Sequence, residues 1–195
     1  MINKYFKKDT SNKKCEIKDF SLSNIDVQNV SFELSRLFNI NILKSNVSDF
    51  AFIKSRTEKC NFSNTKLENS YFKDSVIFNS KTTGTSFADG EFQNTKFEKS
   101  KMDMSNFRFT NLKKIEFNDC VLVNADFQGA KLKNVSFLDC DLKSVDFSQA
   151  DFTKVDLRGS DVGGIKININ NFKELTVNPY QAVYLVGLLG LNVRD

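Results

Sequence analysis

The sequence predicts an all-β fold, a right-handed quadrilateral parallel β-helix of about eight coils with a short C-terminal α-helix. Three observations predict it. From Ile17 to Phe172 every fifth position is almost always apolar: 30 of 32 positions are, 14 of them are Phe, and the exceptions are Thr57 and Thr82. The residue two places before each of these positions is mostly small. The residue two places after is often Asn, Asp or Gly.

A period of five matches neither the 3.6 residues of an α-helix nor the 2 residues of a simple strand. It is satisfied if each five residues form one short side and one corner, with the large and the small side chain pointing inward. Asn, Asp and Gly tolerate the corner backbone. Four sides then make a coil of 20 residues, and coils stack about 4.8 Å apart by parallel pairing. Residues 15–174 therefore make up the β-helix.

The first third of the β-helix departs from this pattern. Large residues stand where small ones are expected, so we expect wider or irregular coils there; these residues are Phe20, Ile25, Ile40 and Phe50.

Residues 1–14 are predicted to be a basic N-terminal tail. They carry five Lys and one Asp, which equals the whole formal charge of +4 and leaves the rest of the chain neutral. Neither a signal peptide nor an apolar run long enough to span a membrane is visible. We therefore expect a soluble, cytoplasmic protein with reduced thiols and no membrane association.

Residues 175–195 are predicted to be a capping and dimerisation helix followed by a tail. Asn178 suits an N-cap, Pro179 suits the first helical position, and Gly190 is a natural stop. The end of a stack of coils must be covered. One apolar face of the helix suits that task, and it consists of Ala182, Leu185, Val186 and Leu189. The segment from Leu191 to Arg194 has the pattern of a final strand.

A second apolar face of the same helix predicts a homodimer, because it would otherwise be exposed. It consists of Tyr180, Tyr184, Leu188 and Leu191. The alternative is a monomer whose helix folds entirely onto its own coil.

Several segments resemble the A(D/N)LXX signature of pentapeptide-repeat proteins, a family of right-handed β-helices. The segments are Ala125–Gly129, Ala150–Lys154 and Val155–Gly159. The C-terminal stretches 156–167, 180–182 and 188–191 are similar to the ends of the quinolone-resistance pentapeptide proteins. That resemblance implies dimerisation through this end and binding to a type II topoisomerase.

No catalytic, cofactor-binding or metal-binding residue is predicted, so the sequence indicates that the protein is not an enzyme. It contains no His, no Gly-rich phosphate loop, no nucleophile elbow and no zinc spacing. Asp residues precede many core positions, and we interpret them as solvated surface rather than as acid pairs for hydrolysis.

Cys60, Cys120 and Cys140 share one column and are predicted to be buried free thiols. The alternative, a disulfide between Cys120 and Cys140, requires side chains that do not point in parallel.

One face of the predicted rod carries more acids than bases and is the candidate acidic face. Its principal members are Asp49, Glu68, Asp89, Asp126 and Asp146. The adjacent face has an excess of Lys. A protein that imitates duplex DNA needs a strong negative potential, and a neutral body supports such mimicry weakly. The loop insertions that interrupt the repeat in quinolone-resistance proteins also have no counterpart in this unbroken frame.

These observations predict a non-enzymatic, homodimeric protein that presents a rigid surface to a protein partner. Outward apolar residues on one column form a candidate docking patch, or are merely scattered surface residues: Phe38, Phe78 and Leu138. The alternative function is binding of DNA gyrase or another topoisomerase to protect it from quinolones or other inhibitors. Direct nucleic-acid binding through the Lys-rich face and the basic tail is the least favoured interpretation.

Overall fold

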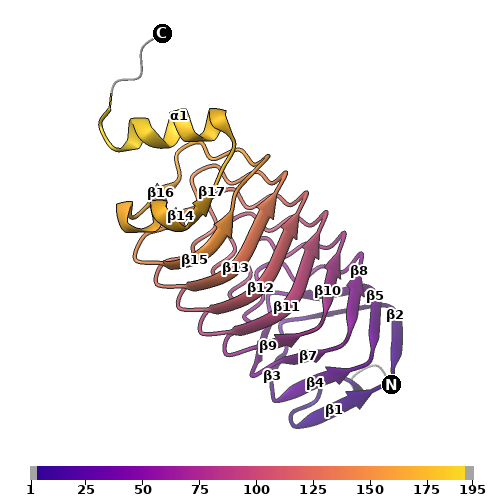
Figure 1. The fold of residues 1–195 in the computed structure, drawn as a ribbon. Helices are drawn as coiled ribbons and strands as arrows, with labels where there is room; N and C mark the ends of the chain where they lie inside the picture. The colour runs from indigo at the N-terminus through magenta and orange to yellow at the C-terminus, as the bar shows by residue number, and fades with distance from the viewer. Residues whose placement is uncertain (1–3, 192–195) are drawn as a thin grey trace.

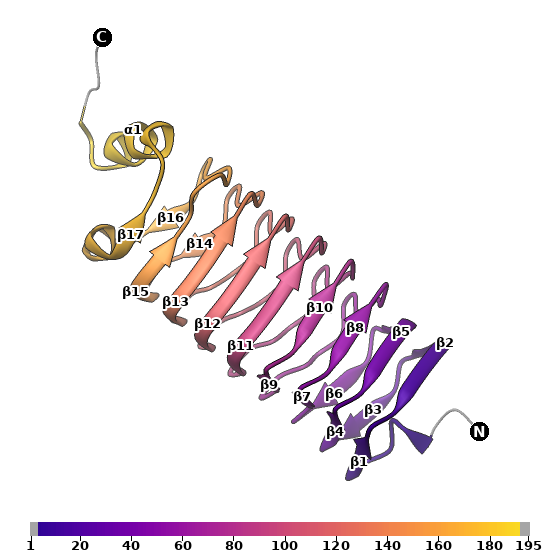
Figure 2. The ribbon, with the colours of Figure 1, turned by 45° about the vertical axis from the view of Figure 1, so that its right-hand side comes forward.

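The computed structural model describes residues 4–191, and they form a stack of short parallel strands wound into a rod (Figures 1 and 2). The N-terminal coil and the C-terminal helix lie at opposite ends of the rod. The elements are β1 (Thr10–Lys13), β2 (Glu16–Ser23), β3 (Asp26–Gln28), β4 (Val30–Glu33), β5 (Arg36–Leu43), β6 (Asn46–Ser48), β7 (Ala51–Ile53), β8 (Arg56–Glu58), β9 (Tyr71–Lys73), β10 (Val76–Phe78), β11 (Glu91–Glu98), β12 (Asn111–Asn118), β13 (Lys131–Leu138), β14 (Asp146–Phe147), β15 (Asp151–Asp156), β16 (Lys166–Ile167), η2 (Ile169–Glu174), β17 (Leu175–Thr176) and α1 (Pro179–Leu188).

Every strand pair is parallel and joins residues twenty positions apart, as at Phe92 and Leu112. Isolated bridges keep the same offset where the strands are too short to be named. β11 turns a corner in its middle, since its first half pairs with β9 and its second half with β10. The predicted fold, a right-handed four-sided β-helix with coils of twenty residues, is therefore confirmed.

The corners explain the five-residue period. Every fifth residue from Asp9 to Gly164 has a positive φ, and most of these residues are not glycine. Left-handed backbone is uncommon for L-residues, and Asn and Asp are enriched there. Bulky residues also occupy some corners, among them Leu34, Met104 and Phe109, and their side chains are forced outward into solvent.

The core consists of phenylalanine rings stacked in columns along the rod. Phe107 and Phe127 stack 4.7 Å apart between ring centroids, as do Phe117 and Phe137. The two columns meet edge to face, at 6.2 Å between Phe117 and Phe127. A twenty-residue repeat thus places each ring on its counterpart in the next coil, in arrangements that aromatic pairs favour.

The sequence predicted that the β-helix begins at residue 15. In the structure it begins earlier. Asp9 already forms a corner and β1 pairs with β4. The side chain of Phe6 is buried against Phe20 and Phe32, so part of the expected tail covers the first coil. The pattern search missed this because the inward position of that coil is Asn12. Its amide donates hydrogen bonds to the carbonyl oxygens of Tyr5 and Ser31.

The expected irregularity of the first coils is wrong for the backbone. Strands β2 and β5 keep the twenty-residue register, and the corners at Asp19 and Asn24 match all later ones. Phe20 and Phe50 are buried within this regular frame.

The repeat ends before Phe172, the last inward position that the sequence predicted. The 3₁₀ turn η2 replaces a strand there, and Asn171 is buried in place of Phe172. The amide of Asn171 donates to the carbonyl oxygen of Ala150. Strand pairing then resumes for one short segment, because β17 pairs with β15 beyond the expected boundary at residue 174.

Candidate interaction surfaces

Helix α1 begins at a complete capping box. The Asn178 side chain accepts a hydrogen bond from the backbone N–H of Gln181, and the Gln181 side chain accepts one from the N–H of Asn178. Pro179 occupies the first turn, where its missing N–H costs nothing. The prediction of a C-terminal helix from Asn178 and Pro179 is confirmed.

The inner side of α1 closes the last coil. Leu185 is buried, and the buried side-chain amide of Gln181 donates hydrogen bonds to the carbonyl oxygens of Leu157 and Ser160. The helix therefore satisfies backbone groups that the end of the stack leaves unpaired. The sequence assigned this role to Leu189, which is exposed, and overlooked Gln181 because it is polar.

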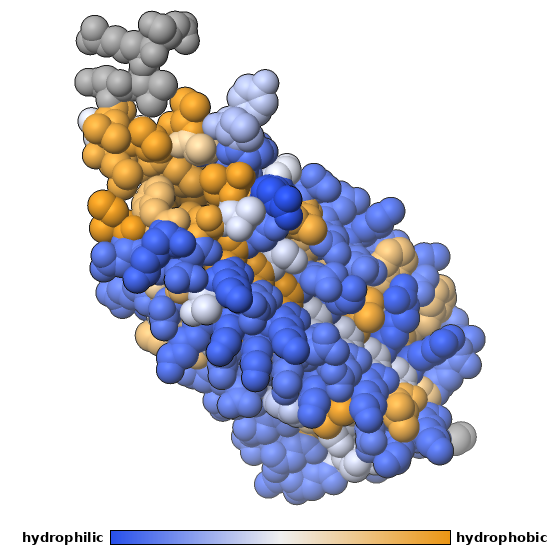
Figure 3. Space-filling view, viewed as in Figure 1, coloured by the Kyte–Doolittle hydropathy of each residue, from blue (hydrophilic) through white to orange (hydrophobic). Residues whose placement is uncertain are grey.

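The outer side of α1 is apolar and exposed. Tyr180 is 88% exposed and Leu191 60%, and Leu188 is also exposed, as the dimer prediction requires. Tyr184 is partly withdrawn, because its hydroxyl accepts a hydrogen bond of 2.6 Å from the N–H of Gly164. The space-filling view shows the apolar surface gathered over this end of the rod, whereas most of the visible remainder is hydrophilic (Figure 3).

Two further apolar residues in the C-terminal part of the chain are exposed, and the sequence did not single out either. Val183 lies one turn from Tyr180, and Ile169 lies in η2; both are more than half exposed. The exposure of Val183 could have been predicted from its helical spacing to Tyr180. The exposure of Ile169 could not have been predicted from the sequence, because it depends on η2 replacing a strand. The predicted strand after Leu191 lies outside the described residues.

The candidate acidic face lies on the side of the rod that includes β3, β6, β14 and β16. Asp49 and Asp89 occupy corners, and Glu68 accepts a hydrogen bond from Ser86. Asp126 pairs with Arg108 at 3.3 Å, and Asp146 pairs with Lys166 at 3.1 Å. The structure thus brings the five predicted acids onto one face, and their charges are partly balanced by cations of the same face.

Asp146 is held most tightly. Burial by itself would raise the pKa of its carboxyl group, but hydrogen bonds from Ser148, Lys166 and Gln128 outweigh it and lower the pKa to about 2. Because the Asp146 carboxylate already accepts these hydrogen bonds within the chain, few of its acceptor positions remain for a partner.

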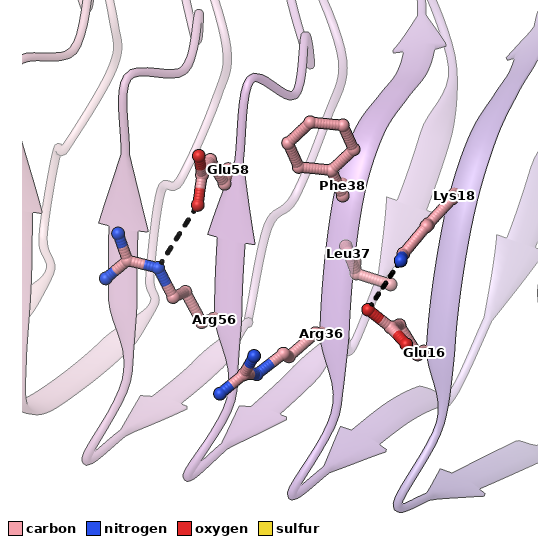
Figure 4. A pocket seen from close by; sticks show the side chains of 7 residues that line it. All are labelled: Glu16, Lys18, Arg36, Leu37, Phe38, Arg56 and Glu58. Carbon is pink, nitrogen blue, oxygen red and sulfur yellow. Dashed lines mark ion pairs between the residues drawn. The ribbon is translucent and has the colours of Figure 1, made fainter.

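A hollow of about 470 Å³ opens between β2, β5 and β8, near the N-terminal end of the rod (Figure 4). It is lined by two acids, three bases and two apolar residues: Glu16, Glu58, Lys18, Arg36, Arg56, Leu37 and Phe38. The sequence predicted Phe38 as part of a candidate docking patch with Phe78 and Leu138, but did not predict the hollow. The hollow could not be predicted from the sequence, because the residues that line it belong to three different coils.

Cys60, Cys120 and Cys140 are buried, as the sequence predicted. All four cysteines are free, and burial raises the pKa of the Cys60 thiol to about 11. The pKa of the Cys120 thiol is also raised, mainly by its contact with Cys140 and also by burial. Between residues 4 and 191 no cluster of three or more Cys, Asp or Glu is arranged to hold a metal. Within the same range, no helix has the length and apolar character needed to cross a bilayer.

Comparison with family models gives matches to the pentapeptide repeat region over residues 51–127, 91–167 and 110–184. A search of curated protein sequences gives no match. Among solved structures, a trypsin-treated variant of QnrB1, described as a plasmid-mediated fluoroquinolone resistance protein, superimposes with a TM-score of 0.68. It is 17% identical over 100% of this chain and 96% of its own.

A second trypsin-treated QnrB1 variant has a TM-score of 0.55 at 16% identity, covering 95% of this chain and 100% of its own. HetL, a pentapeptide-repeat protein involved in heterocyst differentiation regulation in the cyanobacterium Nostoc sp. strain PCC 7120, has a TM-score of 0.47 at 13% identity. That match covers 88% of this chain and 89% of HetL. At these identities the likeness concerns the fold.

Proposed function

The chain belongs to the pentapeptide-repeat family, and we propose that it is a non-enzymatic docking protein whose rigid β-helix holds surface side chains in fixed positions for a protein partner. The observation that carries the proposal is the uncovered apolar surface gathered at α1, on a rod whose visible face is mostly hydrophilic elsewhere. Contiguous apolar patches of this kind are typical of protein–protein contacts.

The first partner we propose for that surface is a second copy of the chain. Helix α1 contains no charged residue, and its outer side is apolar and exposed, so covering that side would remove apolar surface from water. Its inner side covers the last coil. A two-fold contact through Tyr180, Val183 and Leu188 would cover the outer side and join two rods end to end.

Light scattering after size-exclusion chromatography tests this proposal. Wild type should elute as a dimer, and the double variant Val183→Glu/Leu188→Glu should elute as a folded monomer, because paired acids cannot be buried at a two-fold contact. Leu34→Glu is the matched control, since Leu34 is an exposed apolar residue at a corner far from α1. A monomeric wild type, or a variant that stays dimeric, would refute the dimer.

A second candidate partner is a type II topoisomerase, which the chain would protect from fluoroquinolones. It is favoured by the similarity to QnrB1 along the whole chain, which concerns the fold. The balanced charges of Asp126 and Asp146 argue against DNA mimicry as the mechanism. Purified protein in micromolar excess should restore gyrase supercoiling in the presence of a fluoroquinolone; unchanged inhibition would exclude this candidate.

A further inference from the structure

We propose that the hollow between β2, β5 and β8 binds the carboxylate of an Asp or Glu that stands beside a large apolar residue in a partner protein. This inference rests on the docking function proposed above and names the chemistry of a partner for it. The hollow lies near the N-terminal end of the rod, away from α1 (Figure 1), so the two surfaces can be tested separately.

The first observation is two arginines placed side by side. Arg36 and Arg56 are register partners in adjacent parallel strands. Like charges directly opposite each other destabilise a sheet. Farther along the same outward row one pair of neighbours has opposite charges, since Lys96 pairs with Glu116 at 2.8 Å. Arg36 has Glu16 as its register partner on one side and Arg56 on the other, so the like-charge contact is the one between the two arginines.

The second observation is that the nearby acids are already engaged. Glu16 pairs with Lys18 at 2.8 Å, and Glu58 pairs with Arg56 at 3.6 Å. No ion pair of Arg36 occurs among residues 4–191. Figure 4 shows the Arg36 guanidinium extending away from Glu16 and toward the strand that carries Arg56. One guanidinium at the hollow is thus available to an external anion.

The third observation concerns shape and polarity. A guanidinium presents a planar fork of donors that matches a carboxylate. Leu37 is buried beneath the hollow and Phe38 is half-buried at its wall, so an apolar side chain next to the carboxylate would find apolar contacts. A volume of about 470 Å³ accommodates a carboxylate and one such neighbour.

Two cation–π contacts lie at the hollow, one on its lining residue Phe38 and one made by its lining residue Arg56. The Lys59 ammonium lies 5.3 Å from the centroid of the Phe38 ring, and the Arg56 guanidinium lies 4.8 Å from that of Phe78. These contacts keep positive charge at the edge of the hollow. Both the positive rim and the apolar floor therefore favour an acidic residue with an apolar neighbour over either group alone.

A titration followed by NMR tests the site on the full-length protein. The probes are an acetylated and amidated Phe-Glu dipeptide and the matching Phe-Gln dipeptide. The side-chain Nε–H resonances of Arg36 and Arg56 should shift with Phe-Glu and not with Phe-Gln. Those of Arg108 and Arg158 should stay in place, because each already pairs with an aspartate. Equal shifts with both probes, or no shift of Arg36, would overturn the proposal.

Variants separate recognition from a structural role. Arg36→Gln should weaken Phe-Glu binding by about tenfold or more, because a charge-assisted bidentate contact is lost. It should leave the melting temperature unchanged or raise it, because like-charge repulsion is relieved. Arg36→Lys should also weaken binding, since it keeps the charge and loses the fork.

The control is Arg158→Gln, at the other end of the rod, which should leave binding unchanged. A lower melting temperature for Arg36→Gln would show that Arg36 serves the fold instead, and an unchanged affinity would show that Arg36 does not bind the probe; either result overturns the proposal. Neither result would affect the oligomer measurement on α1, so failure of the pocket and failure of the dimer are distinguishable.

Discussion

Several Asp side chains in this protein form local hydrogen bonds that stabilise the turns of the coil. The Asp that precedes a core position accepts a hydrogen bond from the backbone N–H two residues later. The distances are 2.9 Å for Asp126 to Gln128, 2.8 Å for Asp146 to Ser148 and 3.0 Å for Asp156 to Arg158. Such local bonds are what make Asp and Asn common at turns. The acidic residues that the sequence presents as a surface feature are thus largely structural.

Asp146 should contribute a measurable acid dependence to stability. Its pKa is lowered in the folded protein from 3.8 to about 2, so its contribution is complete above the unfolded value and is lost as the pH falls from about 4 to 2. The side chain is only 15% exposed, and the shift corresponds to about 2 kcal/mol.

Denaturant unfolding at pH 2 to 7 checks this expectation. The difference in unfolding free energy between wild type and Asp146→Asn should be constant above pH 5 and should shrink by about 2 kcal/mol toward pH 2. Parallel curves for the two proteins over the whole range would contradict it.

Thr57 is an inward residue that does not fit its position. Its hydroxyl has no hydrogen-bond partner, and it borders a cavity of about 10 Å³ among Phe50, Phe72 and Phe97. Thr57→Val keeps the shape and removes the unsatisfied hydroxyl. It should raise the unfolding free energy by about 1 kcal/mol, measured by denaturant titration. Thr65→Val is the control and should destabilise, because the Thr65 hydroxyl donates a 2.7 Å hydrogen bond to the carbonyl of Ile42.

At the scale of elements, the two ends of the rod are closed by different means. Phe6 and Asn12 close the N-terminal end, whereas η2 and α1 close the C-terminal end. At the N-terminal end the Asn12 amide donates hydrogen bonds to the carbonyl oxygens of Tyr5 and Ser31. At the C-terminal end Asn171 and Gln181 replace missing backbone donors, where apolar residues would leave carbonyl groups unpaired.

Gln181→Ala should destabilise the C-terminal end. It removes both hydrogen bonds to the carbonyls of Leu157 and Ser160 and one half of the capping box. We expect a loss of about 2 kcal/mol in unfolding free energy. Hydrogen exchange should show faster exchange confined to α1 and the last coil, with Gln128→Ala, on the surface of the acidic face, as the control. Uniform acceleration along the rod would contradict a local role.

At the scale of the whole molecule, each coil contacts its neighbours through the same register of twenty. Stability in such a stack is approximately a sum of coil and interface contributions. Length can therefore change without altering which side chains share a face, provided that whole coils are added or removed. This property suits a rod that keeps surface groups at fixed spacing.

Deleting one whole coil, residues 101–120, should leave a folded and shorter β-helix. The corners, the Phe columns and α1 all keep their frame, because residue 121 then follows residue 100 as residue 101 did. Deleting only 101–108 moves every later corner and inward residue out of the five-residue frame and should abolish cooperative unfolding. Circular dichroism with thermal melting checks both variants, and a cooperatively folded 101–108 deletion would refute the five-residue frame.

The sequence by itself determined the period, the coil length, most of the inward positions, the corners and the C-terminal helix. It could do so because each of these depends on a local requirement repeated every five residues: an apolar side chain, then a backbone that tolerates positive φ. Helical spacing in turn predicted the apolar face that includes Tyr180 and Leu188, and both residues are exposed.

Only the tertiary structure decided how the ends are closed and which charges are balanced. Phe6, Asn12 and Gln181 became caps because of where the stack stops, and a periodic pattern contains no information about its own ends. The pairing of Asp146 with Lys166 and the adjacency of Arg36 and Arg56 arise from residues twenty positions apart. Whether such residues attract each other, repel each other or leave a hollow depends on the side-chain conformations in adjacent coils. A five-residue repeat unit contains no information about those conformations.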